Sequence, residues 1–165
     1  MSTPAIQIRA AETTDAPGIL QCLSEAFARY RTAYTPAGFH DTVLDTPSLL
    51  ARMQQMHILV ACLGGEIIGT VAGAAGTGGK GHLRGMAVLP AHHGTGIAAQ
   101  LLGAIEEWLA DQGCPRVSLD TTRPLLTAMH FYEKHGYSRS GRISDFFGMQ
   151  LLEYTKDLRL NQADS

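Results

Sequence analysis

Residues 88–98 read VLPAHHGTGIA and join a predicted strand over 81–89 to a predicted helix over about 95–112. The first amides of a helix have no partner inside the helix, and they lie at the positive end of its dipole. Gly94 and Gly96 carry no side chain that would keep a ligand away from these amides. The stretch therefore predicts an anion-binding site suited to a diphosphate, although the same glycines could serve a tight turn alone.

The spacing within this stretch excludes two familiar phosphate-binding loops. In nucleoside triphosphatases a lysine and then a serine or threonine follow the last glycine, whereas Ile97 and Ala98 follow Gly96 here. A dinucleotide-binding fold needs a third glycine at a fixed spacing after the second, and the chain lacks it. A nucleotide-binding protein is therefore disfavoured.

The chain has 165 residues, which is enough for one domain with a sizeable core. Its 45% hydrophobic and 17% charged content and its net charge of -2 are typical of a globular protein. The chain has no excess of basic residues, so its charge does not indicate nucleic acid or an anionic membrane as a partner. No apolar run approaches the ~18 residues that a membrane-spanning helix needs, and residues 1–5 do not resemble a signal peptide.

The cysteines and histidines do not form a metal-binding pattern. Cys22, Cys62 and Cys114 are odd in number and far apart, which is typical neither of a disulfide framework nor of a zinc site. They are expected to be free thiols, so a cytoplasmic location is expected. His92 and His93 are adjacent, and adjacent residues seldom share one ion, so no metal is expected.

Apolar periodicity and turn residues divide the rest of the chain into strands and helices. Strands are expected over 6–10, 57–63, 66–75, 81–89, 115–121, 137–141 and about 144–154. Helices are expected from the caps at 13–15 through Tyr30, and over 48–55, about 95–112 and 124–135. A loop, with or without a short helix in it, is expected over 32–46, and a polar, frayed tail is expected over 156–165.

This order of elements predicts the fold class. The three tightly connected strands over 57–89 must be antiparallel, and the later strand–helix–strand segment favours a parallel crossover. The expected class is α/β (α+β), with one mixed central sheet of six to seven strands and helices on both faces. No repeat or linker divides the chain, so a single domain is expected over 1–165, with its core over about 6–155.

Three segments resemble the motifs of one known family. Residues 88–98 resemble a V-x-P strand end followed by Gln/Arg-x-x-Gly-x-Gly/Ala, residues 128–137 resemble A-x-x-F-Y-x-K-x-G-F, and residues 9–15 resemble an opening R-x-A-x-x-x-D. These motifs are those of the GNAT superfamily of acetyl-CoA-dependent N-acetyltransferases, and the resemblance covers about residues 6–155. The chain departs from the pattern at His93, where the family has Gln or Arg, and at Leu125, where it often has Asn.

The resemblance implies an N-acetyltransferase that moves an acetyl group from acetyl-CoA to a primary amine by direct attack in a ternary complex. The alternative is a non-catalytic acyl-CoA-binding or sensing module with the same fold. The residues that the resemblance assigns to the coenzyme are Met86, Ala87, Val88, His93, Gly94, Thr95, Gly96, Ile97, Ala98 and Tyr132. An oxyanion donor is expected from the backbone N–H of Ala87 or Val88.

Two residues are expected to carry the chemistry. The resemblance implies that the Tyr132 hydroxyl protonates the departing thiolate, whereas helical spacing alone would make it a core aromatic. His82 is the candidate base, because several family members keep a catalytic Glu or His there; otherwise it is an exposed strand-end histidine. Alternation places His82, Arg84, Met86 and Val88 on one face unless a bulge at Gly85 breaks the count.

The acceptor pocket is expected from the first helices and the late loops, as elsewhere in the family. The candidate substrate-binding residues are Phe27, Tyr30, Tyr34 and Phe146. They predict an aromatic, mostly neutral lining, which favours a small-molecule amine or an amino-acid-like compound over a protein. A homodimer is compatible with the resemblance.

Overall fold

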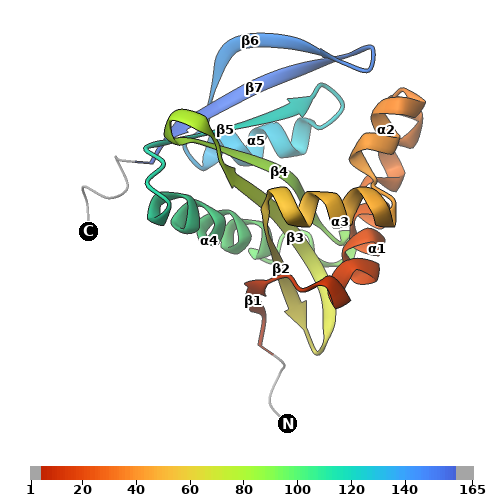
Figure 1. Cartoon of the computed structure of the whole chain (residues 1–165). Helices are drawn as coiled ribbons and strands as arrows, with labels where there is room; N and C mark the ends of the chain where they lie inside the picture. The colour runs from red at the N-terminus through yellow and green to blue at the C-terminus, as the bar shows by residue number, and fades with distance from the viewer. Residues whose placement is uncertain (1–4, 159–165) are drawn as a thin grey trace.

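The computed structural model describes residues 5–158, which form one seven-stranded mixed sheet in the order β1-β2-β3-β4-β5-β7-β6 (Figure 1). The strands are β1 Gln7–Ala10, β2 His57–Leu63, β3 Glu66–Ala75, β4 Lys80–Val88, β5 Arg116–Thr122, β6 Ser138–Phe146 and β7 Met149–Asp157. All neighbours are antiparallel except β4 and β5, which are parallel. The predicted mixed sheet and fold class are confirmed.

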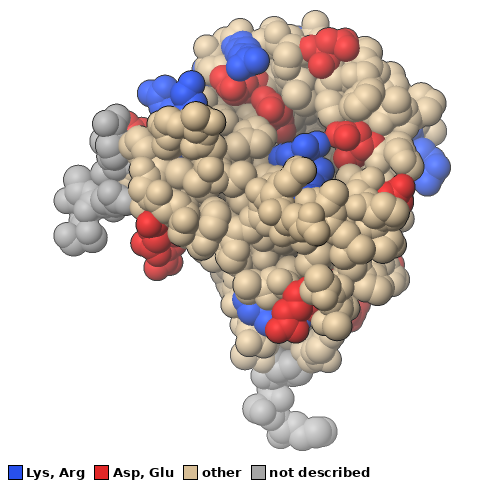
Figure 2. All heavy atoms as spheres, in the orientation of Figure 1, with Lys and Arg blue, Asp and Glu red and all other residues tan. Residues whose placement is uncertain are grey.

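Residues 5–158 contain five α-helices, with α1 and α3 on one face of the sheet and α4 and α5 on the other (Figure 1). They are α1 Ala16–Phe27, α2 Pro36–Thr42, α3 Thr46–Gln55, α4 Ile97–Asp111 and α5 Leu126–Lys134. Figure 2 shows that the face turned to the viewer is hollowed, and that acidic and basic side chains lie side by side at the hollow.

The α4 helix lies close to the sheet because the strand beneath it carries glycines. A Cβ atom on Gly69 of β3 would lie 2.9 Å from Leu101, and one on Gly73 would lie 2.8 Å from Ile105. Such distances are too short for a real Cβ, so larger residues would push the helix away. Ile97, Leu101 and Ile105 of α4 face these glycines and are buried.

Between α1 and β2, one expected element boundary is wrong. The expected loop over 32–46 contains α2, a seven-residue helix whose Thr35 cap accepts a hydrogen bond from the Gly38 amide. Two turns of helix are too short to show periodicity. The α3 helix begins at Thr46, two residues before the predicted start, because the Asp45 side chain caps it.

The other errors concern the end of the sheet. The β7 strand continues to Asp157 and Leu158 is buried, so the expected tail is wrong for 156–158; residues 159–165 lie outside the described residues. The β6–β7 turn lies at Phe147 and Gly148, both at positive φ, and not near 141–144. Gly141 has φ 92° within a register shift of β6, so it marks a bulge.

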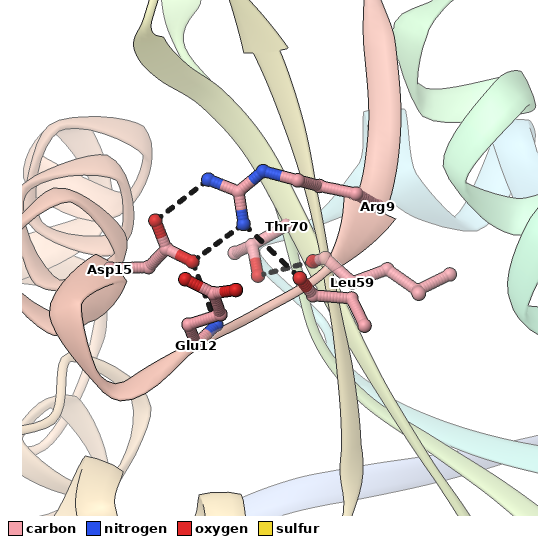
Figure 3. Close-up of polar contacts among 6 residues, drawn as sticks. Arg9, Glu12, Asp15, Leu59 and Thr70 are labelled. Carbon is pink, nitrogen blue, oxygen red and sulfur yellow. Dashed lines mark hydrogen bonds and ion pairs between the residues drawn. The ribbon is translucent and has the colours of Figure 1, made fainter.

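A bidentate ion pair fixes the passage from β1 into α1 (Figure 3). The Arg9 guanidinium donates to the two carboxylate oxygens of Asp15 at 2.7 and 2.8 Å, and the Glu12 amide donates to the same carboxylate at 2.7 Å. Arg9 also donates to the Ala10 carbonyl at 3.1 Å. These bonds tie the first strand to the turn that starts the first helix. The predicted opening motif therefore has a structural role here.

This ion pair makes the stability of the fold depend on acid. Hydrogen bonding to Arg9 lowers the pKa of Asp15 from an ordinary 3.8 to about 2. The contribution of the Asp15 carboxylate to the free energy of unfolding is therefore complete above pH 3.8 and is lost as pH falls through about 2. We expect Asp15→Asn to reduce the free energy of unfolding by about 1–2 kcal/mol at pH 7, measured by urea denaturation.

The matched control is Asp111→Asn at the exposed end of α4, which should change the free energy of unfolding by less than about 0.5 kcal/mol. The difference between wild type and Asp15→Asn should shrink as the pH is lowered toward 2. A difference that stays constant from pH 7 to pH 3 would show that the carboxylate charge contributes nothing.

Candidate active-site cleft

The β4 and β5 strands pair only at their beginnings. Their parallel register runs from Lys80–Arg116 to Leu83–Leu119 and then stops, although β4 continues to Val88. Beyond this point the β5-facing edge of β4 has no strand partner within residues 5–158. An unpaired strand edge can accept an extended ligand as an additional strand.

A β-bulge lies within the unpaired part of β4. Ala72 of β3 pairs with Arg84 and Thr70 pairs with Ala87, so two residues of β4 oppose one of β3. Gly85, one of the two, has φ 63°, a conformation that favours glycine. The bulge shifts the alternation, so Ala87, and not Val88, shares the face of Arg84. The bulge at Gly85, which the sequence analysis gave as the exception, therefore breaks the alternation, and Val88 does not share the face of His82 and Arg84.

A cleft of about 1020 Å³ opens at the splay, which is the place where β4 and β5 separate after Leu83 and Leu119. It brings together every residue predicted for the site except Thr95, from segments far apart in the sequence. These residues are Phe27, Tyr30, Tyr34, His82, Met86, Ala87, Val88, His93, Gly94, Gly96, Ile97, Ala98, Tyr132 and Phe146. A cleft of this size is suited to a small-molecule or cofactor site.

The α4 helix points its first turn into the cleft. Gly96 is the N-cap at φ 84°, and the first helical bond runs from the Gln100 amide to the Gly96 carbonyl. The amides of residues 97–99 therefore have no partner within the helix. A Cβ atom on Gly94 or Gly96 would meet nothing within 4 Å. These glycines thus provide positive φ, and the space before the helix start is open.

The His93 ring is turned back onto the end of β4. Its Nε2 lies 2.9 Å from the Val88 carbonyl, which can only accept, so Nε2 carries the proton. A neutral His93 then has no second N–H to offer an anion, and the helix amides remain as the donors. The Thr95 hydroxyl donates to the His92 carbonyl, which explains why Thr95 does not line the cleft.

Tyr132 lies on α5 at the wall of the cleft and is buried among Phe131 and Tyr137. Burial raises its pKa, so the hydroxyl keeps its proton at neutral pH. Within residues 5–158 the Tyr132 hydroxyl has no hydrogen-bond partner. It is not fully enclosed, because the Thr121 hydroxyl is the one fully buried polar side-chain atom of these residues that lacks a partner. The Tyr132 hydroxyl is therefore reached from the cleft.

His82 lies on β4 just before the splay, between two polar residues of β5. Its Nδ1 is 3.1 Å from the Ser118 hydroxyl, and its Nε2 is 4.0 Å from an Asp120 carboxylate oxygen. Burial lowers the pKa of His82, while Asp120 opposes this shift and Arg84 adds to it. The imidazole is therefore mostly neutral at pH 7, as a base must be.

Asp120 is a site residue that sequence reasoning missed. Burial raises its pKa and the His82 charge opposes this shift. The signal was present, because alternation along β5 places Ser118 and Asp120 on one face beside the parallel strand that carries His82. It could be used only once β4 and β5 were known to be neighbours.

The acceptor side of the cleft is aromatic but not mostly neutral, which corrects that expectation. Phe27 and Tyr30 pack with ring centroids 6.4 Å apart, and the buried Tyr34 hydroxyl is 2.6 Å from that of Thr122. Charged side chains also line the cleft there, and they are Arg29, Asp41, Arg52, Arg84 and Asp120. Sequence reasoning considered the segments around α1 and β6, and so it missed Arg52 on α3.

Other features of the described chain bear on the expected class. Cys22, Cys62 and Cys114 are buried free thiols, as predicted, and the cytoplasmic location remains a prediction. Within residues 5–158 no three His, Cys, Asp or Glu side chains are grouped to hold a metal ion. The helices of this part of the chain are all too short or too polar to cross a membrane.

Solved structures share this fold at low sequence identity. The PaiA N-acetyltransferase of Thermoplasma acidophilum, in complex with coenzyme A, superposes with a TM-score of 0.77 at 18% identity over 93% of this chain and 99% of that one. The ribosomal-protein-S18-alanine N-acetyltransferase of Escherichia coli gives a TM-score of 0.75 at 15% identity over 93% and 94% of the two chains. At these identities the likeness shows the fold alone.

A family comparison of the sequence goes further than the fold. The model of the acetyltransferase (GNAT) family matches residues 20–137, which is well over half of the 165-residue chain. The matched segment contains β4, the loop before α4, α4 itself and Tyr132. The chain therefore belongs to the GNAT family of acetyltransferases.

Proposed function

We propose that the chain is an N-acetyltransferase that moves an acetyl group from acetyl-CoA to the primary amine of a small molecule, by direct attack in a ternary complex. One observation carries this proposal: the unpaired edge of β4 and the free amides of α4 open into the same cleft as a neutral histidine and a protonated tyrosine.

The coenzyme fits the two ends of the splay. The amides of residues 97–99 and the open space before Gly94 and Gly96 suit the diphosphate. The main chain of Met86, Ala87 and Val88 offers a strand edge to the extended pantetheine. When bound there, acetyl-CoA supplies an activated acyl group as a thioester.

The Val88 amide is the better placed of the two expected oxyanion donors. The Leu89 amide donates to Ile68 at 2.8 Å, so it points toward β3. Successive amides of a strand point in opposite directions, which turns the Val88 amide into the splay. There it can stabilise the negative charge that develops on the thioester oxygen.

His82 and Tyr132 handle the two protons of the reaction. Transfer forms a C–N bond and breaks a C–S bond, so the amine loses a proton and the departing thiolate gains one. His82, neutral and beside Asp120, accepts the amine proton directly or through one water. Tyr132 keeps its proton until the thiolate leaves and then donates it.

The coenzyme loop is tested by a pair of substitutions that differ in charge alone. Asn and Asp both tolerate the positive φ of Gly96, so Gly96→Asn and Gly96→Asp should have similar stability. We expect Gly96→Asp to bind coenzyme A about 10- to 100-fold more weakly than Gly96→Asn, by titration calorimetry, because its carboxylate faces the diphosphate. Equal affinities would remove this loop from the coenzyme site.

Tyr132→Phe should keep coenzyme affinity and lower kcat by about 10²- to 10⁴-fold, because it removes the proton donor. The matched control is Tyr154→Phe, which removes a tyrosine hydroxyl that donates to Glu133 at 3.2 Å outside the cleft. Thiol release with acetyl-CoA and a panel of amines measures both. A wild-type kcat in Tyr132→Phe would assign Tyr132 to packing alone.

The pH dependence tests His82. Since burial lowers its pKa below the ordinary 6.5, kcat/KM at saturating acetyl-CoA should rise through a pKa below 6.5 and then level off. We expect this limb to be lost in His82→Gln. Asp120→Asn should move it to lower pH, because the Asp120 charge raises the pKa of His82.

The pH at which kcat/KM rises must not follow the pKa of the amine when the acceptor is changed. If the rise survives in His82→Gln, the base lies elsewhere in the cleft. A chain that binds coenzyme A but releases no thiol with any amine would instead be the non-catalytic acyl-CoA-binding module.

A further inference from the structure

Arg52 stands out among the charged groups of the cleft. It comes from α3 and its guanidinium lies against the bulge of β4, since a Cβ atom on Gly85 would be 3.1 Å from its Nη1. The side chain is partly buried. Within residues 5–158 it makes no hydrogen bond or ion pair. A partly buried guanidinium without a partner is costly, because it has lost water and gained no acceptor.

The charges around Arg52 do not balance. Arg84 lies nearby and its charge disfavours that of Arg52, while the Asp41 carboxylate opposes this effect. Asp41 is already bound to Arg84, at 2.9 Å. Two arginines therefore share one carboxylate. Burial and Arg84 lower the pKa of Arg52 to about 10, which still leaves it charged at pH 7.

A negative charge lies beside β4 a short distance from Arg52 and Arg84. Asp120 of β5 lies beside His82, and His82 comes two residues before Arg84 on β4. Residues two apart on a strand are roughly 7 Å apart and point to the same face. The cleft thus offers an acidic end beside the expected base and a basic end at Arg52. A molecule with an ammonium group and a carboxylate would match both ends.

From this charge arrangement, and on the basis of the proposed function, we infer that the acceptor is a primary amine that carries a carboxylate, and that Arg52 binds this carboxylate. Arg52 is then a specificity-determining residue. The planar guanidinium can take a carboxylate by two parallel hydrogen bonds. Phe27 and Tyr30 provide an apolar wall for the rest of the acceptor.

Matched acceptors test this inference at two spacings between amine and carboxylate. The pairs are phenylalanine against phenethylamine and 4-aminobutyrate against butylamine. We expect the acid of at least one pair to have a kcat/KM about 10- to 100-fold higher than its partner, mainly through KM. Arg52→Gln should abolish that preference and leave kcat and coenzyme A affinity close to wild type.

The control is Arg31→Gln, an arginine that stacks on Phe39 outside the cleft and should leave the preference unchanged. Calorimetry of the coenzyme-A-saturated protein with the N-acetylated acid and the N-acetylated amine measures the same preference without turnover. Equal binding and equal rates within both pairs, or a preference that survives in Arg52→Gln, would overturn the inference. Failure to turn over any amine would contradict the proposed function instead, and calorimetry would still decide the role of Arg52.

Discussion

The site depends on one constraint, which is that β4 and β5 stop pairing after Leu83 and Leu119. Up to that point their parallel register holds the two halves of the sheet together. Beyond Leu83, β4 still pairs with β3 on its other side, and this pairing fixes the position of the unpaired edge. A cleft of about 1020 Å³ can therefore open inside a continuous sheet. Residues of β4 and β5 line part of that cleft, and the packing of these strands in the sheet fixes their positions.

Glycines set the geometry on each side of this opening, by different means. Gly85 allows the bulge that turns β4, and Gly96 allows the chain to enter α4 with its amides free. Gly69 and Gly73 let α4 lie against β3, so the helix start is held at the end of the strand. His93 adds a hydrogen bond from the loop to Val88. The loop before α4, the proposed coenzyme loop, is thus fixed at both ends before any ligand arrives.

Much of this could be predicted from local sequence. The proposed anion site at Gly94 and Gly96 depends on a strand, a turn and a helix start that are contiguous, and the structure has each of these elements. His82 and Tyr132 could be named because motifs placed them, although their roles await experiment. Asp120 and Arg52 could not be found, because each becomes a site residue only through contact with a distant segment. The bulge likewise changes which residues share a face, and register alone reveals it.

The topology also has a consequence for how the chain is made. The last strand, β7, does not lie at an edge: it is inserted between β5 and β6, and it pairs with β5 along Arg116–Thr122. On the ribosome, β5 therefore has an open side until residue 157 has emerged. Exposed strand edges invite pairing with other chains. During synthesis the chain therefore carries an unpaired strand beside an unfinished cleft, and pairing of that strand with another chain is a route to misassembly until β7 has formed.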